Sequence, residues 1–146
     1  MSSIEIDEDE LIDLLTGRHS RSILVGLLND AQRQAIGAFS HTVWLSAYTA
    51  RKIYAKHRDD TLGIYMLAPT ILRIGESRRL NKEFRQLVFL YSRYTEIQRP
   101  YRAVVKTTAD GRENFLLSVY RITKGQIGKT LGMSDSIKAS RGGASR

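Results

Sequence analysis

The dipeptide Asp110-Gly111 lies between two runs of strand-forming residues, and this arrangement limits the fold more than any other feature of the chain. The runs, 101–107 and 115–120, are rich in β-branched and aromatic residues. Glycine accepts the positive φ that a tight turn requires, so the pattern predicts a hairpin of two antiparallel neighbours. A third run, 87–91, extends this prediction to a sheet in the second half of the chain.

The first half of the chain alternates short apolar runs with helical patterns. Asn29 and Ser46 are both placed to cap a helix, and Gly37 is placed to end the first one. Pro69 lies within a third helical stretch, so we expect that helix to begin near Ala68 or to be kinked. The expected elements are strands at 23–28 and 43–45 and helices at 30–36, 47–57 and 62–74.

Charge is divided unevenly along the chain. The first 15 residues hold six of the 15 acidic side chains and no Lys or Arg. Residues 16–146 therefore hold nine acids against all 23 Lys and Arg, a net charge of about +14. A body with this much positive charge attracts polyanions, and nucleic acid is the commonest partner of that kind. The alternative is that the charge only makes the surface soluble and has no specific partner.

Three segments are expected from these patterns. An acidic arm, 1–16, carries an amphipathic stretch that either docks a partner through its leucines or folds back on the basic body. A single domain is expected over 17–131, and a chain of this length buries enough apolar surface to fold without disulfides. The end of the chain, 132–146, is small, polar and basic, and is expected to be a flexible tail.

The absence of cysteine excludes disulfides, thiolate metal sites and a cysteine nucleophile. The longest apolar runs are far shorter than the roughly 20 residues that a membrane-spanning helix needs. The acidic start also lacks the positively charged region that opens a signal peptide. We therefore expect no membrane partner and a location in the cytoplasm.

Two stretches carry a resemblance to a known family. The first is VWLSAYTARKIYAKH at 43–57 followed by YMLAPTIL at 65–72, and the second is the expected hairpin at 101–121. Both resemble the phage-associated barnase/EndoU/colicin/RelE-like nuclease domains that form the C-terminal part of Mu F-type phage head proteins. The resemblance spans about residues 21–124 and implies short helices packed on a twisted, mainly antiparallel sheet.

Enzymes of this wider fold class are metal-independent ribonucleases, so the resemblance implies no metal and no cofactor. Cleavage would need a base for the ribose 2′-hydroxyl, an acid for the leaving oxygen and cations around the phosphate. His57 matches the family's histidine and Lys52 the lysine one turn earlier. Each has a structural alternative, because His57 can pack and cap its helix and Lys52 can be a solvated charge. The family's proline and acid after the histidine are replaced by Arg-Asp-Asp at 58–60.

Four further candidates lie in the expected hairpin. Arg102 and Lys106 have even spacing, so they share one face of a strand and are suited to holding a phosphate, unless that face is merely solvated. A two-residue turn pairs Arg102 with Val119 and puts Ser118 and Tyr120 on the opposite face, whereas a slip of one residue brings them together. The candidate catalytic residues are therefore His57, Lys52, Arg102, Lys106, Ser118 and Tyr120.

The leading hypothesis is a phage-derived ribonuclease-like toxin or effector that acts on RNA, with RNA favoured over DNA as its nucleic-acid partner. A virion-associated head or neck protein that keeps the fold without catalysis is the alternative. In that case the acidic arm would dock phage structural proteins, and the location would be the virion rather than the host cytoplasm. A plain nucleic-acid-binding protein is the third hypothesis.

Overall fold

The structure is a computed structural model that describes residues 4–83, 85–92 and 100–137. Its helices are α1 (Glu8–Leu15), α2 (Asp30–Ile36), α3 (Ala47–Lys56), α4 (Arg58–Ile74) and α5 (Lys124–Gly132). Its strands are β1 (Ile23–Leu27), β2 (Thr42–Leu45), β3 (Glu76–Leu80), β4 (Gln86–Tyr91), β5 (Tyr101–Thr107), β6 (Asn114–Arg121) and β7 (Ser134–Ser136). These elements confirm the predicted α+β class.

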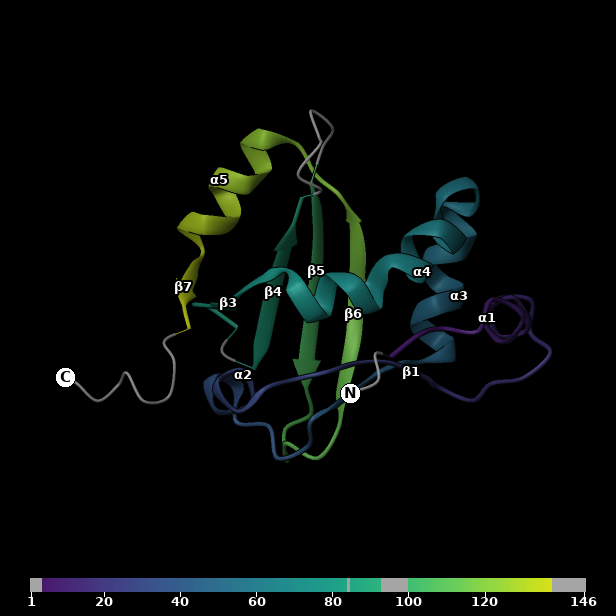
Figure 1. The fold of residues 1–146 in the computed structure, drawn as a ribbon, viewed down its shortest axis with the longest axis horizontal. Coiled ribbons are helices and arrows are strands. Elements are labelled where there is room, and N and C mark those ends of the chain that lie inside the picture. Colours follow the sequence, from purple (N-terminus) through teal and green to yellow (C-terminus); the bar gives the residue numbers. More distant parts are fainter. Residues whose placement is uncertain (1–3, 84, 93–99, 138–146) are drawn as a thin grey trace.

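The strands form one mixed sheet in the order β1-β2-β6-β5-β4-β3-β7 (Figure 1). Only β2 and β6 are parallel among the strand pairs of the described residues, and every other neighbouring pair is antiparallel. The main core lies between the sheet and helices α1, α3 and α4, and it includes Tyr65 of α4 and Phe89 of β4. The other face carries a smaller apolar cluster and α5, which is held there by a bond from Arg102 Nε to Thr130 Oγ1 of 3.2 Å.

Local capping fixes α2 and α3 at the positions that the sequence predicts. Asn29 Oδ1 accepts a hydrogen bond from the Gln32 amide at 2.8 Å, and the Gln32 side chain accepts one from the Asn29 amide at 2.9 Å. Gly37 ends α2 with a φ of 74°. Ser46 caps α3 by accepting a hydrogen bond from the Thr49 amide.

Helix α4 is longer than the sequence predicts. It begins at Arg58 and continues through Pro69 to Ile74, so the expected start near Ala68 is wrong. The proline removes one backbone donor, but its ring is buried with five other side chains of the same helix. Burial of this face against the sheet outweighs the lost hydrogen bond.

No helix in the described part of the chain is long and apolar enough to cross a membrane.

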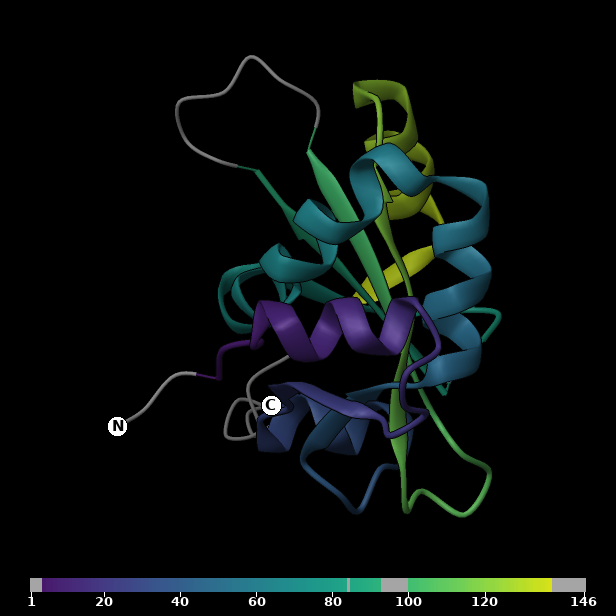
Figure 2. The same cartoon turned by 90° about the vertical axis from the view of Figure 1, so that its right-hand side faces the viewer.

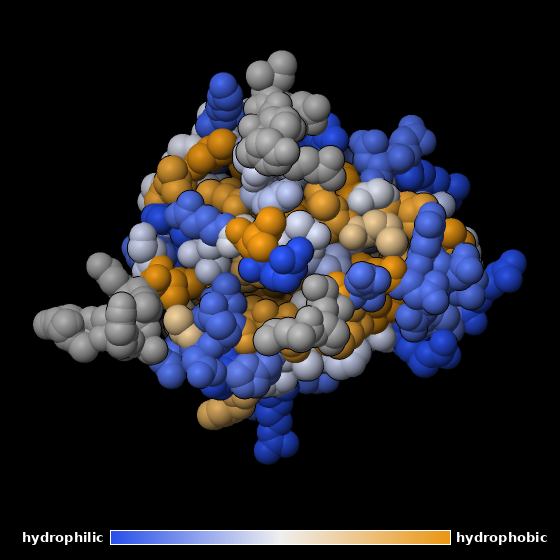
Figure 3. Space-filling view, in the orientation of Figure 1, coloured by the Kyte–Doolittle hydropathy of each residue, from blue (hydrophilic) through white to orange (hydrophobic). Residues whose placement is uncertain are grey.

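Helix α1 belongs to the same core as the rest of the domain. Leu11 and Leu14 are fully buried in the main cluster, and Leu15 is 6% exposed. Arg51 of α3 donates from Nε to the Leu14 carbonyl at 2.8 Å, which places a cation at the end of α1. Figure 2 shows α1 beside α3 and α4, and hydrophilic side chains gather over this side of the molecule in Figure 3. Of the two arrangements expected for the acidic segment, the structure has the one that packs on the body.

The hairpin of β5 and β6 contains a β-bulge that changes its register. Lys106 pairs with Phe115, as a turn centred on Asp110-Gly111 predicts. The register then shifts by one residue beyond Val104, so that Arg102 pairs with Tyr120 rather than with Val119. The expectation from an uninterrupted hairpin, that Arg102 and Tyr120 lie on opposite faces, is therefore wrong.

The segment expected to be a tail begins with a strand. β7 pairs with the edge of β3, and Arg78 of β3 donates from Nε to Ser134 Oγ at 2.7 Å. Arg79 forms an ion pair with Asp135 at 3.3 Å. The described structure therefore continues to residue 137, and the rest of the expected tail lies outside the described residues.

Candidate functional site

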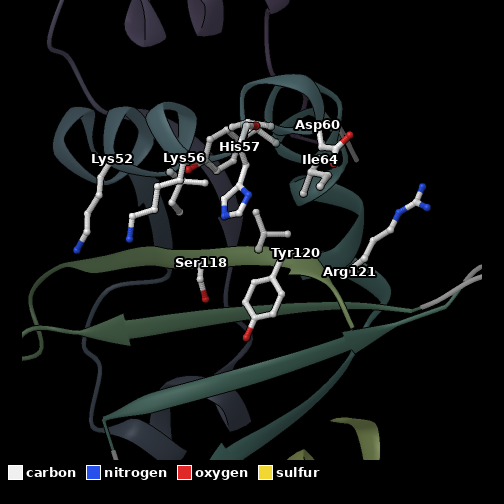
Figure 4. Close-up of a pocket in the computed structure, with 12 residues that line it drawn as sticks. Lys52, Lys56, His57, Asp60, Ile64, Ser118, Tyr120 and Arg121 are labelled. Atoms are coloured by element: carbon white, nitrogen blue, oxygen red, sulfur yellow. Dashed lines mark hydrogen bonds between the residues drawn. The ribbon is translucent and has the colours of Figure 1, made fainter. Parts of the chain in front are cut away.

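A cavity of about 440 Å³ lies between helices α3 and α4 and the C-terminal half of β6 (Figure 4). Its position follows from the strand pairing. β2 pairs with β6 only at Asn114 and Phe115, where the Asn114 side chain donates to the carbonyls of Ser40 and Thr42 at 2.8 and 2.9 Å. Beyond Phe115 this edge of β6 has no strand partner among the described residues, and the helices lie beside it instead.

His57 stands at the junction of the two helices. Its amide donates to the Ile53 carbonyl of α3 at 3.0 Å, and its carbonyl accepts from the Thr61 amide of α4 at 3.1 Å and from the Thr61 hydroxyl. The main chain of His57 therefore joins the helices, while its exposed side chain forms no hydrogen bond with any described residue. Figure 4 shows the imidazole directed toward β6.

The other two histidines are engaged with main-chain carbonyls. His19 Nε2 lies 3.2 Å from the Glu10 carbonyl, and His41 Nδ1 lies 3.0 Å from the Leu28 carbonyl. His57 is thus the histidine whose ring nitrogens are available to a ligand.

Two lysines extend over the cavity from α3. Lys52 and Lys56 are four residues apart, which places them on the same side of the helix, and both point toward β6 in Figure 4. Arg121 stands at the other end and is held by a hydrogen bond from its Nε to the Tyr101 hydroxyl at 3.2 Å. Asp60 is the one carboxylate among the described residues that line the cavity, so cations outnumber acids there. This excess favours an anionic ligand.

Ser118 and Tyr120 line the cavity from β6, but their hydroxyls point away from His57 (Figure 4). The Tyr120 hydroxyl accepts a hydrogen bond from Arg102 Nη1 at 2.9 Å on the other face of the sheet. Arg102 therefore holds Tyr120 and α5 and does not itself reach the cavity. Lys106 lies near the opposite end of β5, opposite Phe115, and does not line the cavity either.

The structure therefore brings together four of the six candidates, and it adds residues that the sequence reasoning missed. Lys56 repeats the position of Lys52 one turn later, so helical spacing was sufficient to find it. Asp60 lies in the first turn of α4, whose start was predicted too late. No local sequence pattern predicts that Arg121 belongs to the site, because it lines the cavity only where β6 has no strand partner among the described residues.

Tyr65 of α4 contributes a buried polar group beside the cavity. Its side chain is 1% exposed, and its hydroxyl has no hydrogen-bond partner among the described residues. Burial raises the pKa of Tyr65 well above its usual range. The neighbouring lining residues Ile53, Ile64 and Val119 are apolar, so the cavity combines an apolar floor with a cationic rim.

Comparison with protein families, with curated proteins and with solved structures finds no match to this chain. Within the described residues, no three His, Cys, Asp or Glu side chains are grouped so that they could hold a metal ion. The interpretation of the site therefore depends on its own side chains.

Proposed function

We propose that this protein is a barnase/EndoU/RelE-like, metal-independent ribonuclease-like domain that acts on RNA phosphodiesters in the cavity beside β6. The observation that supports the proposal most is the unengaged imidazole of His57, which points toward β6 in a cavity that Lys52 and Lys56 also line. An imidazole with free nitrogens next to lysines provides both proton transfer and phosphate binding.

Four residues that line the cavity have a role in the chemistry of this proposal. Asp60 accepts the proton of the ribose 2′-hydroxyl, whose oxygen then forms a bond to phosphorus. The bond from phosphorus to the 5′-oxygen breaks, and the imidazolium of His57 gives that oxygen a proton. Lys52 and Lys56 stabilise the negative charge that grows on the phosphate oxygens. Arg102 is a positioning residue, because it reaches the site only through Tyr120.

The alternative of a non-catalytic head protein has less support from the fold. One argument for it was that the leucines of the acidic arm are available for docking, and Leu11 and Leu14 are fully buried in the core. A nuclease-like toxin or effector remains the role that fits the proposed chemistry.

Cleavage of RNA by the purified full-length protein in the presence of EDTA tests the proposal. We expect cleavage by the wild type, and a loss of at least about 100-fold in His57→Ala, which removes a proton-transfer group. His41→Ala is the matched control, because it removes an imidazole outside the cavity, and it should cleave like the wild type. If the wild type does not cleave RNA, or if His57→Ala cleaves it equally well, the proposed ribonuclease activity of this site is refuted. Salt-dependent binding without cleavage would leave only a nucleic-acid-binding protein.

A further inference from the structure

Tyr48, Lys52 and Lys56 form a stripe along the outer side of α3. They are spaced by four residues, so they share one side of the helix and follow one another at intervals of about 6 Å along its axis. Lys52 and Lys56 line the cavity, whereas Tyr48 lies one turn before it. The stripe therefore leads from open surface to the candidate site.

The ring of Tyr48 is available to a ligand. Tyr48 is 75% exposed, and Lys52 Nζ lies over its ring, 5.9 Å from the ring centroid. Tyr65 and Tyr101 are buried, in contrast, and Tyr54 is covered in part by Arg58. An exposed flat ring with a cation over one face offers its other face to a base, next to a phosphate-binding group.

We infer that this stripe binds single-stranded nucleic acid, with one base stacked on Tyr48 and the adjoining phosphates against Lys52 and Lys56. The inference rests on the proposed function, because it assigns a substrate form to the same cavity. In a duplex each base face is covered by the next base pair, so Tyr48 finds a free base only in a single strand. Lys52 and Lys56 contact the phosphates of that strand where it enters the cavity, which His57 also lines.

The arrangement distinguishes a nucleic-acid strand from a protein partner. A protein that covered Tyr48 through apolar contact alone would have no use for the two lysines on the same stripe. A single strand uses both kinds of group, because each nucleotide presents a flat base and a charged phosphate. Loss of Tyr48 should therefore affect single strands selectively, and loss of Lys52 should lower the salt dependence of binding.

The test measures the binding of the full-length protein to an RNA of about twelve nucleotides whose 2′-hydroxyls are methylated. Methylation replaces the proton of each 2′-hydroxyl, so that oxygen can no longer attack phosphorus and affinity is measured apart from cleavage. We expect Tyr48→Ala to weaken binding of the single strand by about tenfold and to leave binding of the matching duplex unchanged. Tyr48→Phe keeps the ring and should bind like the wild type.

Phe39→Ala is the matched control, because Phe39 is also 75% exposed but lies in the loop before β2 rather than on α3. It should bind single strands like the wild type. Equal affinities of Tyr48→Ala and wild type overturn the inference, as does an equal loss on single strand and duplex. Either result leaves the cleavage test of His57→Ala to decide the proposed function separately. Because Tyr48 is largely exposed, thermal melting should show that its variants are folded.

Discussion

Replacement of Leu14 by alanine tests whether the acidic N-terminal helix belongs to the core. Leu14 is fully buried, and its carbonyl is fixed by Arg51 Nε at 2.8 Å, so the end of α1 has little freedom to close a cavity left by the lost methyl groups. Truncation of a buried leucine costs about 2–5 kcal/mol of unfolding free energy, and limited relaxation favours a value of about 3 kcal/mol or more. That is a large part of the roughly 5–15 kcal/mol by which such domains are stable.

Urea denaturation followed by circular dichroism measures this loss. The midpoint should fall with little change in slope, and the melting temperature should drop by roughly 10 °C. Ile12→Ala is the control, because Ile12 lies on the same helix, is 37% exposed and should cost well under half as much. If Leu14→Ala unfolds at the wild-type midpoint, α1 does not pack on the body in solution and the acidic segment is a separate arm.

Two further predictions concern Tyr65 and Gly26. Tyr65→Phe should raise the unfolding free energy by about 1 kcal/mol, because it removes a buried hydroxyl that has no partner among the described residues. Burial raises the pKa of Tyr65, so the folded protein keeps this proton to a higher pH than the unfolded chain does. Above about pH 10 the unfolding free energy therefore falls by up to about 1.4 kcal/mol per pH unit. Urea denaturation at several pH values should show a smaller fall in Tyr65→Phe. Gly26→Ala should lower the unfolding free energy measured by urea denaturation by about 1–3 kcal/mol, because a Cβ there would lie 2.6 Å from Leu72 Cδ1. Gly63→Ala, on open helix surface, should not destabilise, and equal effects of the two glycine variants would show that the contact with Leu72 does not decide the result.

The parts of the fold that local chemistry determines could be predicted from the sequence. The bounds of α2 follow from the capping box at Asn29 and from Gly37, and the hairpin follows from Asp110-Gly111. The bulge was missed because a turn alone sets the register only near the turn. The structure shows its effect on burial, since Leu116 and Val119 both face the core although they are three residues apart, which regular alternation does not allow.

The cavity could not be predicted in the same way, because it depends on contacts between distant segments. Residues of β2 meet the start of β6 about 70 positions later in the chain, and no local pattern specifies that parallel pair. The length of α4 was missed for a related reason. Its buried face against the sheet stabilises a helix that Pro69 alone would disfavour.

The site nevertheless depends on one local event, the short length of β2. Ser46 caps α3 directly after Leu45, so the chain leaves the sheet after only two residues have paired with β6. The rest of that edge of β6 stays free of a strand, and the helix that begins at the cap carries Lys52 and Lys56 across it. A longer β2 would fill the edge and displace α3 from β6. The cap therefore sets where β2 ends and where α3 begins, which explains why residues of α3 and of β6, from two distant parts of the chain, both line the cavity beside His57.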